Sequence, residues 1–323
     1  MDVPVTGTEG SPYPRPGSWQ VSTSYRWQKS DRHFVGSEEQ KNREADSSQV
    51  INRINLFDLG VRYNLSQRTS FSLSVPYLLA SRSNPIRNAT RVVIDRSVTH
   101  ASSISDAVLT VRRWMRAPDS CKGGNFSLGL GMKAPTGQSD HTDVRRAFSN
   151  GTIVTSTAPV DQSIQPGDGG FGFVVEATGF RRFGMRAVGY ASGIYLFNPK
   201  EQNKTDRGGT DPNTRFLSIG DQYLARVGLA GSLKSWTLSV GGRVEGMPAK
   251  DLIGGSKGFR RPGYAVSLEP GLTFRHGRSA FTAGLPVALY RNRTRSYADK
   301  INGGHGDAAF ADYILMLGYS RLF

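Results

Sequence analysis

The chain has 323 residues, of which 38 are glycine and one is cysteine, and its formal net charge is +15. No stretch approaches the roughly 18 consecutive apolar residues that a membrane-spanning helix needs, so such a helix is excluded. Strands are not excluded, because a barrel strand needs only about 9 to 11 residues and shows lipid every second side chain. The single Cys121 rules out an internal disulfide, and we expect it to lie unpaired in a turn.

The positive charge is spread along the chain rather than concentrated. Lysine and arginine never form a dense basic run, which argues against a nucleic-acid partner. A charge of this sign favours attraction of anionic solutes, or of the phosphates of lipopolysaccharide.

The N-terminus, Met1-Asp2-Val3, is not followed by the charged and apolar regions of a signal peptide. We therefore interpret the chain as a mature form whose export signal has been removed. We expect residues 1–17 to be a periplasmic N-terminal segment and residues 18–323 to form one domain.

Apolar and polar residues alternate along most of this domain. In the first segment Trp19, Val21, Tyr25 and Trp27 share one face, and polar side chains occupy the other. Such period-2 alternation indicates strands with one apolar and one polar face. The segments with this pattern lie near residues 19–27, 57–63, 71–79, 107–111, 126–132, 171–177, 185–197, 223–229, 236–244, 264–274, 281–289 and 313–319.

The gaps between these segments alternate between turns of a few residues, such as 64–68 and 232–235, and much longer polar loops. This order predicts an all-β fold, a transmembrane antiparallel β-barrel of about 12 strands with short periplasmic turns and long extracellular loops. An even number of strands places both termini on the same side, and closure removes the unpaired edges that lipid does not tolerate.

Aromatic residues mark the ends of the predicted strands, where a barrel carries its interfacial girdles. The alternative is a soluble sandwich, in which the same side chains would fill the core. The aromatic residues concerned are Trp19, Trp27, Tyr63, Phe71, Tyr77, Trp236, Tyr264, Phe274, Phe281 and Tyr290.

The C-terminal sequence Gly318-Tyr319-Ser320-Arg321-Leu322-Phe323 resembles the assembly signal of outer-membrane barrels, which ends in an aromatic residue. Gly318, Tyr319 and Phe323 carry the resemblance, whereas Arg321 stands where that signal usually has a hydrophobic residue. The resemblance implies the barrel-assembly machinery and outer-membrane lipids as partners.

Several strings resemble an outer-membrane family associated with the meta-pathway of phenol degradation, whose members are barrels often called transporters. They are Ser74-Val75-Pro76-Tyr77, Ser105-Asp106-Ala107 ahead of residues 109–113, Leu128-Gly129-Leu130-Gly131-Met132-Lys133-Ala134-Pro135-Thr136-Gly137, and Gln165-Pro166-Gly167-Asp168-Gly169-Gly170. Together they cover the middle third of the chain. The resemblance implies an outer-membrane location and passage of small hydrophobic or aromatic compounds, and it supplies no catalytic residues.

If the apolar face meets lipid, the opposite face lines the lumen. We expect Arg62, Arg112, Arg226 and Arg243 to meet an anionic solute, held in place by carboxylates such as Glu176. The alternative is that these charges only brace the lumen and no solute passes. The predicted lumen-lining residues are Arg26, Asp58, Arg62, Asp106, Arg112, Lys133, Glu176, Arg226, Arg243, Glu245, Glu269 and Arg275.

Signals for an enzyme are weak. The five histidines fall in predicted loops or turns without metal-site spacing, so we predict no enzyme activity, no metal and no cofactor. His100 near Ser102 and Ser103 is the closest arrangement to a lipid hydrolase. Other loop candidates are a Ca²⁺ site at Asp140, Asp143, Asp161 and Asp168, and lipid phosphate contacts at Arg293, Arg295 and Lys300.

The function that these observations favour is a passive outer-membrane channel for small hydrophobic, aromatic or anionic solutes. A non-conducting barrel whose long loops bind a partner or lipopolysaccharide is the alternative, and a lipid hydrolase is the third. The loop of residues 135–168 either plugs the lumen or stands outside it, and the sequence leaves both open.

Overall fold

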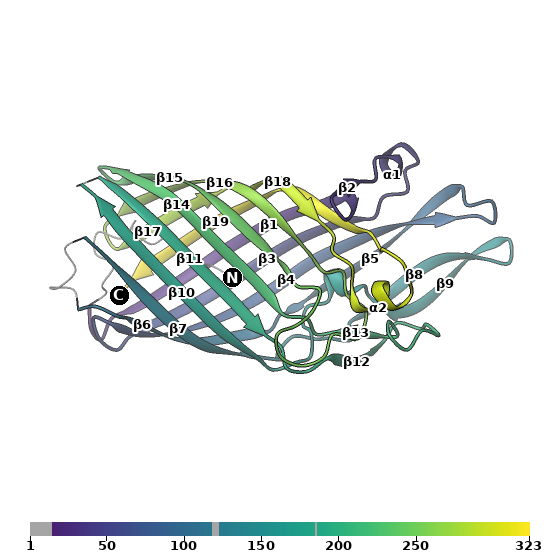
Figure 1. Ribbon diagram of the computed structural model, residues 1–323, viewed down its shortest axis with the longest axis horizontal. Coiled ribbons are helices and arrows are strands. Elements are labelled where there is room, and N and C mark those ends of the chain that lie inside the picture. Colours follow the sequence, from purple (N-terminus) through teal and green to yellow (C-terminus); the bar gives the residue numbers. More distant parts are fainter. Residues whose placement is uncertain (1–14, 118–122, 185) are drawn as a thin grey trace.

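The computed structural model describes residues 15–117, 123–184 and 186–323, and within them the chain forms a closed antiparallel barrel of twelve spanning strands (Figure 1). The ring closes because the last strand pairs with the first over most of its length. In order around the barrel the strands are β1 (Trp19–Val35), β3 (Ile51–Asn64), β4 (Thr69–Arg87), β5 (Val93–Ile104) with β6 (Ala107–Trp114), β7 (Gly124–Ala134), β10 (Gly172–Phe183), β11 (Ala187–Phe197), β14 (Gln222–Leu233), β15 (Trp236–Met247), β16 (Gly263–His276), β17 (Ser279–Gly284) with β18 (Val287–Asn292), and β19 (Ala308–Leu322).

Two of the spanning strands are interrupted. β5 and β6 both pair with β4 and are separated by Ser105 and Asp106. β17 and β18 both pair with β16 and are separated by Leu285 and Pro286. Proline has no backbone N–H to donate, so the ladder breaks at Pro286.

Side-chain exposure follows the alternation of the sequence. On β7, Phe126, Leu128 and Leu130 are 48%, 48% and 67% exposed, whereas the intervening Asn125 and Ser127 are buried. A soluble sandwich would bury these apolar residues in its core, and the closed ring leaves them on its outer wall. The prediction of a twelve-strand transmembrane barrel is therefore confirmed.

Two rows of aromatic side chains border the apolar wall. Trp236, Phe274, Phe281 and Tyr319 form consecutive ring contacts at one end, with centroids 4.6 to 6.4 Å apart. Contacts such as Trp27 with Tyr313 form the second row. The rows are separated by about six to ten residues, which in strands tilted by about 40° corresponds to roughly 15 to 25 Å, close to the height of a lipid-facing band.

The two ends of the barrel differ, as Figure 1 shows. The turn end has tight connections such as residues 65–68 and 277–278, and it also carries the C-terminus. The loop end has the long connections. These contain β2 (Glu38–Glu39), α1 (Asn42–Ala45), the hairpin of β8 (Thr142–Ser149) and β9 (Thr152–Pro159), η2 (Gln162–Ile164), β12 (Gln202–Asp206), β13 (Phe216–Ser218) and α2 (Tyr297–Ile301).

Several strands run beyond the apolar band at the loop end. β4 and β5 extend as a hairpin over residues that the sequence pattern assigned to a loop, and β1 and β3 extend likewise. The expectation that all histidines lie in loops is wrong for His33 on β1 and His100 on β5. Outside the hydrocarbon a strand needs no apolar face, so its polar sequence resembles that of a loop.

Three of the sequence predictions concern residues outside the described ones. These are the N-terminal segment up to residue 14, Cys121, and Met185 at the start of the seventh predicted strand. Among the residues that the structure describes, no helix has the length and apolar character needed to cross a membrane.

Candidate functional site

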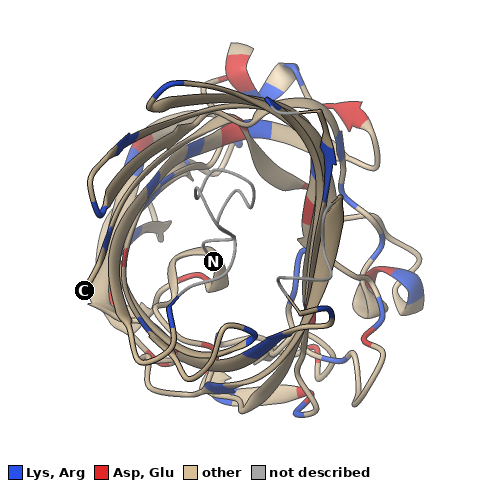
Figure 2. Ribbon diagram, turned by 90° about the vertical axis from the view of Figure 1, so that its left-hand side faces the viewer, with Lys and Arg blue, Asp and Glu red and all other residues tan. Residues whose placement is uncertain are grey.

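The half of the lumen nearer the turn end contains a cavity of about 220 Å³. Figure 2 looks along the barrel from this end and shows charged positions distributed around the ring. Residues of β1, β3, β4, β14 to β17 and β19 contribute most of the cavity wall, with further residues from β6, β10 and β11. Because period-2 alternation turns the polar face inward, the wall carries many hydroxyl, carboxylate and guanidinium groups, with apolar side chains between them.

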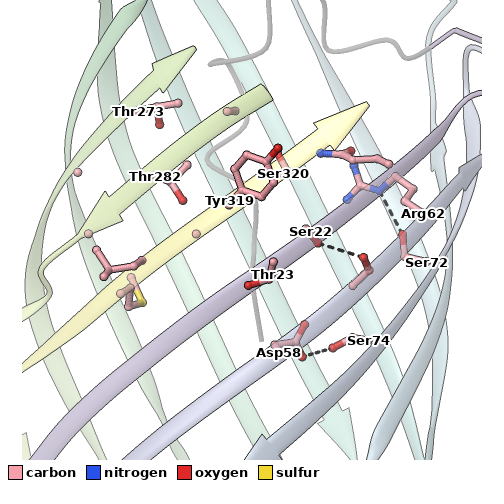
Figure 3. A pocket seen from close by; sticks show the side chains of 18 of the residues that line it. Ser22, Thr23, Asp58, Arg62, Ser72, Ser74, Thr273, Thr282, Tyr319 and Ser320 are labelled. Atoms are coloured by element: carbon pink, nitrogen blue, oxygen red, sulfur yellow. Dashed lines mark hydrogen bonds between the residues drawn. The ribbon is translucent and has the colours of Figure 1, made fainter. Parts of the chain in front are cut away.

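Part of this wall is a network of short polar bonds (Figure 3). Ser74 donates a hydrogen bond to the Asp58 carboxylate, and Arg62 Nε donates to Ser72 Oγ at 3.2 Å. Ser22 Oγ lies 3.5 Å from the carbonyl oxygen of Gly60. These bonds join neighbouring strands and hold the polar groups flat against the wall.

Buried ion pairs cross intervening strands. Arg112 Nε on β6 contacts Glu176 Oε1 on β10 at 2.7 Å, across β7. Arg226 on β14 pairs with Glu269 on β16, across β15, and Arg243 Nη1 lies 3.7 Å from the same carboxylate. A carboxylate buried in the lumen is stable only when it is paired in this way.

One ion pair spans a longer part of the ring. Arg26 on β1 reaches Glu245 on β15 at 3.1 Å, although three spanning strands separate them around the barrel. Arg243 also contacts Glu245, at 2.6 Å. This ion-pair bridge narrows the lumen on the side of the cavity that faces the loop end.

Small residues make room for these side chains. A Cβ on Gly129 would lie 2.3 Å from Glu176 Cγ, and one on Gly241 would lie 2.7 Å from the Tyr190 hydroxyl. Only glycine allows the longer side chains of adjacent strands to lie over the wall at these positions.

All twelve predicted lumen residues are described, and the structure divides them into three groups. Arg26 and Glu245 form the bridge above the cavity, and Asp106 and Lys133 lie in a separate cluster with Asp168. The remaining eight line the cavity, and they are Asp58, Arg62, Arg112, Glu176, Arg226, Arg243, Glu269 and Arg275.

The cluster around Asp106 fixes both ends of a loop. Lys133 pairs with Asp168 and lies 3.7 Å from Asp106. The Asp106 carboxylate accepts hydrogen bonds from the backbone N–H groups of Gly137 and Asp168. The loop that leaves β7 and enters β10 is therefore closed at its base.

The loop of residues 135–168 has two parts with different positions. The β8–β9 hairpin lies beyond the membrane band, whereas residues 160–164, which we call the lid, fold into the mouth of the barrel. Val160 and Ile164 are buried against Leu78, Ala80 and Ala101 on the inward face of β4 and β5. The lid contains no periodic pattern, so its position could not be predicted from the sequence.

Asp161 anchors the lid electrostatically. Its carboxylate accepts bonds from both Nη atoms of Arg261, at 2.8 and 2.9 Å, and lies 3.5 Å from Arg82 Nη2. Burial alone would raise the pKa of Asp161, but these two guanidinium groups hold it far below its ordinary range. The same carboxylate caps η2 by accepting from the backbone N–H of Ser163.

Other loops pack at the mouth through buried polar groups. Arg260 makes a bidentate ion pair with Asp251, and both side chains are fully buried. Asp221 accepts from the backbone N–H groups of Asn198 and Leu252. These contacts tie the β11–β14 and β15–β16 connections together.

The loop candidates for a metal site do not come together. Within the described residues no group of three or more metal-binding side chains is present. Asp143 lies near His100, Asp161 pairs with arginines and Asp168 pairs with Lys133, so three of the four carboxylates predicted for Ca²⁺ have basic partners instead.

The suggested lipid contacts and the hydrolase arrangement find little support in the geometry. Arg293 is buried and bonded to Asp299, so the prediction that it meets lipid phosphate is wrong. The exposed His100 ring has Asp143 at 3.6 Å, but among the described residues no hydrogen bond joins it to Ser102 or Ser103.

Neither a family model nor a curated protein matches the chain. Among solved structures it is similar to an outer membrane channel from Pseudomonas putida F1, with a TM-score of 0.65 and 13% identity over 100% of both chains. It is also similar to the translocator domain of the autotransporter NalP from Neisseria meningitidis (TM-score 0.49, 12% identity, 98% of this chain and 90% of that one). The Pseudomonas putida toluene transporter TodX has a TM-score of 0.48 and 10% identity, over 95% and 90% of the two chains.

At these identities only the fold is shared, and the first similarity establishes it. The chain has the fold of an outer-membrane channel barrel. The barrel implied by the short sequence strings is confirmed, whereas no match supports membership of the phenol-degradation family.

Proposed function

We propose that the protein is an outer-membrane channel that passively admits small anionic solutes. The observation that carries the proposal is the polar cavity inside a closed barrel whose outer wall is apolar. Short turns face the periplasm in barrels of this kind, so the turn end is periplasmic and the loop end faces outward.

The charge balance of the lumen supports a preference for anions. Among the twelve described residues expected to line it, seven are arginine or lysine and five are aspartate or glutamate. Four of the five carboxylates are paired with basic groups, as in the Arg112–Glu176 and Arg226–Glu269 contacts, and the surplus is positive. A narrow pore with surplus arginine favours anion entry.

The lumen also carries an apolar strip. Val174, Ile194, Leu196 and Leu224 form a buried cluster on β10, β11 and β14, with Val108 of β6 packed against it. Three of these residues, Val108, Val174 and Ile194, line the same cavity as Glu176 and Arg226. A small aromatic acid has one group that fits the strip and another that fits the arginines, so we propose this class as the solute.

The proposal also includes how the barrel is assembled in the outer membrane and which lipids it contacts there. Phe323 donates its backbone N–H to Trp19 O at 2.7 Å, beside the seam where β19 meets β1. A C-terminal signal of Gly318, Tyr319 and Phe323, recognised by the barrel-assembly machinery, would complete this seam last. Export through a removed signal peptide and contact with lipopolysaccharide are further parts of the proposal.

Planar-bilayer recording tests the proposal directly. Purified protein should give small, steady currents, and a KCl gradient should give a reversal potential of the sign that indicates anion preference. A barrel that serves only as a scaffold for a partner would give no current at any voltage or salt concentration, and that result would refute the channel.

A further inference from the structure

The loop end contains a second cavity, of about 420 Å³, that lies outside the channel cavity. Its volume is within the range of small-ligand pockets, roughly 300 to 1,000 Å³. It lies between the inward faces of β4 and β5, the β8–β9 hairpin and the loops after β12 and β15. Among the described residues its wall contains one carboxylate, Asp161, and the arginines Arg82, Arg87, Arg145, Arg146, Arg207 and Arg261.

The positive charge of this cavity is only partly compensated. Arg146 pairs with Asp95, and Arg82 shares Asp161 with Arg261. In the described part of the chain no carboxylate forms an ion pair with Arg145 or Arg207. Guanidinium groups that are gathered around one cavity repel one another and are stabilised by an anion between them.

Arg207 is held in a fixed position. Its guanidinium carbon lies 3.3 Å from the centroid of the Phe259 ring, and Nη1 donates to the Thr214 carbonyl oxygen at 3.2 Å. Arg261 lies on the same ring at 4.6 Å. Burial partly desolvates the Arg207 guanidinium group and thereby lowers its pKa. A preorganised arginine of this kind loses little freedom when it binds an oxyanion.

The contacts of Asp161 show how the arginines of this cavity bind a carboxylate. Arg261 binds this carboxylate through two parallel N–H bonds, the fork geometry by which arginine recognises carboxylates and phosphates. Arg82, on β4, contacts it from another element. The carboxylate of the lid thus occupies the position that an incoming anion would take.

The same ion pairs separate two cavities. Arg82 and Arg261 also line an inner cavity of about 260 Å³, together with His33, Asn52 and Asp307. Arg82 and Arg261, which hold Asp161 on the side of the outer cavity, therefore form part of the wall between the two cavities. Loss of this contact would remove the electrostatic anchor of the lid.

We propose that the outer cavity binds a small carboxylate or phosphate anion, which replaces Asp161 as the partner of Arg82 and Arg261 and releases the lid from the barrel mouth. Binding of the anion in the outer cavity does not depend on the proposed channel function, whereas release of the lid rests on that function. The site thereby selects anions before they reach the lumen.

Calorimetry on the full chain in detergent tests the binding step, with benzoate and inorganic phosphate as probes and benzyl alcohol as an uncharged comparison. Benzoate and phosphate should bind, and benzyl alcohol should not. Arg207→Gln and Arg145→Gln should each weaken binding by roughly tenfold, the factor that corresponds to about 1.4 kcal/mol. Lys257→Gln removes an exposed charge from the β15–β16 connection outside the cavity and should leave binding unchanged.

Arg145 is exposed on β8, so its replacement keeps the test valid even if Arg207→Gln folds poorly. Equal affinity in Arg145→Gln, Lys257→Gln and the unmodified protein would overturn the proposal. Binding to vesicles that contain lipid A, without binding of free benzoate or phosphate, would identify a lipid-phosphate site and would also overturn it.

The Asp161→Asn variant tests the exchange between the lid and the anion. Without the competing carboxylate, benzoate should bind at least about tenfold more tightly. In bilayers, benzoate should increase the current through the unmodified protein by releasing the lid. The variant should already conduct more without benzoate, and benzoate should not increase its current further. If the protein conducts ions but binds no anion, the inference about the outer cavity is refuted and the proposed channel function stands. If it binds anions but does not conduct, the channel function is refuted and the anion site stands.

Discussion

Arg226 on β14 extends across β15 and binds Glu269 on β16, with Nε 2.9 Å from Oε2 and both side chains less than a tenth exposed. The pair lies against the lumen wall rather than across the opening. It therefore fixes the positions of two charges while leaving space along the axis. Arg112 on β6 and Glu176 on β10 repeat the arrangement across β7, further along the same wall.

Neutralising one partner of this pair should destabilise the barrel. Glu269→Gln leaves Arg226 and Arg243 facing each other without their shared carboxylate, and we expect a loss of roughly 3 kcal/mol in the free energy of unfolding. Guanidinium unfolding in lipid vesicles measures the loss. Glu38→Gln, an exposed site at the loop end, is the matched control, and an equal effect of both variants would show that the lumen pair contributes nothing specific.

Two glycines of the barrel wall should respond differently to the same change. Gly129→Ala inserts a Cβ into the position of the Glu176 side chain and should cost about 1 to 3 kcal/mol of stability. Gly242→Ala meets no atom within 4 Å and should be neutral or slightly stabilising. The temperature at which the folded band disappears on a semi-native gel compares the two variants, and a neutral Gly129→Ala would contradict the packing described for Glu176.

Reversing a charge in the cavity should change ion selectivity. Arg62→Glu replaces a positive group of the cavity wall with a negative one. One unit charge at 4 Å in water contributes about 1 kcal/mol, so the anion-to-cation permeability ratio should fall by roughly fivefold or more. Reversal potentials in a KCl gradient measure this ratio, and Arg113→Glu, at an exposed position on β6, should leave it nearly unchanged.

The anchoring of the lid should depend on pH only in strong acid. The pKa of Asp161 is depressed in the folded state, so its ion pairs stabilise the protein fully above the unfolded pKa of about 3.9. This stability is lost as pH falls from that value through the much lower folded pKa. The stability difference between the unmodified protein and Asp161→Asn should therefore be constant from pH 5 to 8 and shrink below about pH 4. A difference that disappears near pH 6 would show that Asp161 is not held by Arg82 and Arg261.

The parts of the fold that sequence analysis could predict are those in contact with lipid. The alternation of Phe126, Leu128 and Leu130 with polar residues reflects a wall with hydrocarbon on one side, and this pattern sufficed for strand number and closure. The alternation also indicated which charges face inward. It could not indicate which of them pair, because the Arg26–Glu245 bridge depends on how the ring closes and on the tilt of its strands.

The loop end could not be predicted, for a related reason. β4 and β5 continue beyond the membrane with polar side chains on both faces, and no hydrophobic period distinguishes them from a loop. The lid is held by tertiary contacts of Val160, Asp161 and Ile164 with residues far away in the sequence. Its position, and the outer cavity that it borders, became evident only from the folded chain.

The most direct test of a solute path through the lumen is cysteine modification during bilayer recording, in a background where Cys121 is replaced by serine. Thr282 lines the cavity, whereas the adjacent Phe281 is 49% exposed on the outer wall. We predict that a charged methanethiosulfonate reagent reduces the current through Thr282→Cys and leaves the current through Phe281→Cys unchanged. Equal responses of the two variants, or no current in either, would contradict a channel that runs through the interior of this barrel.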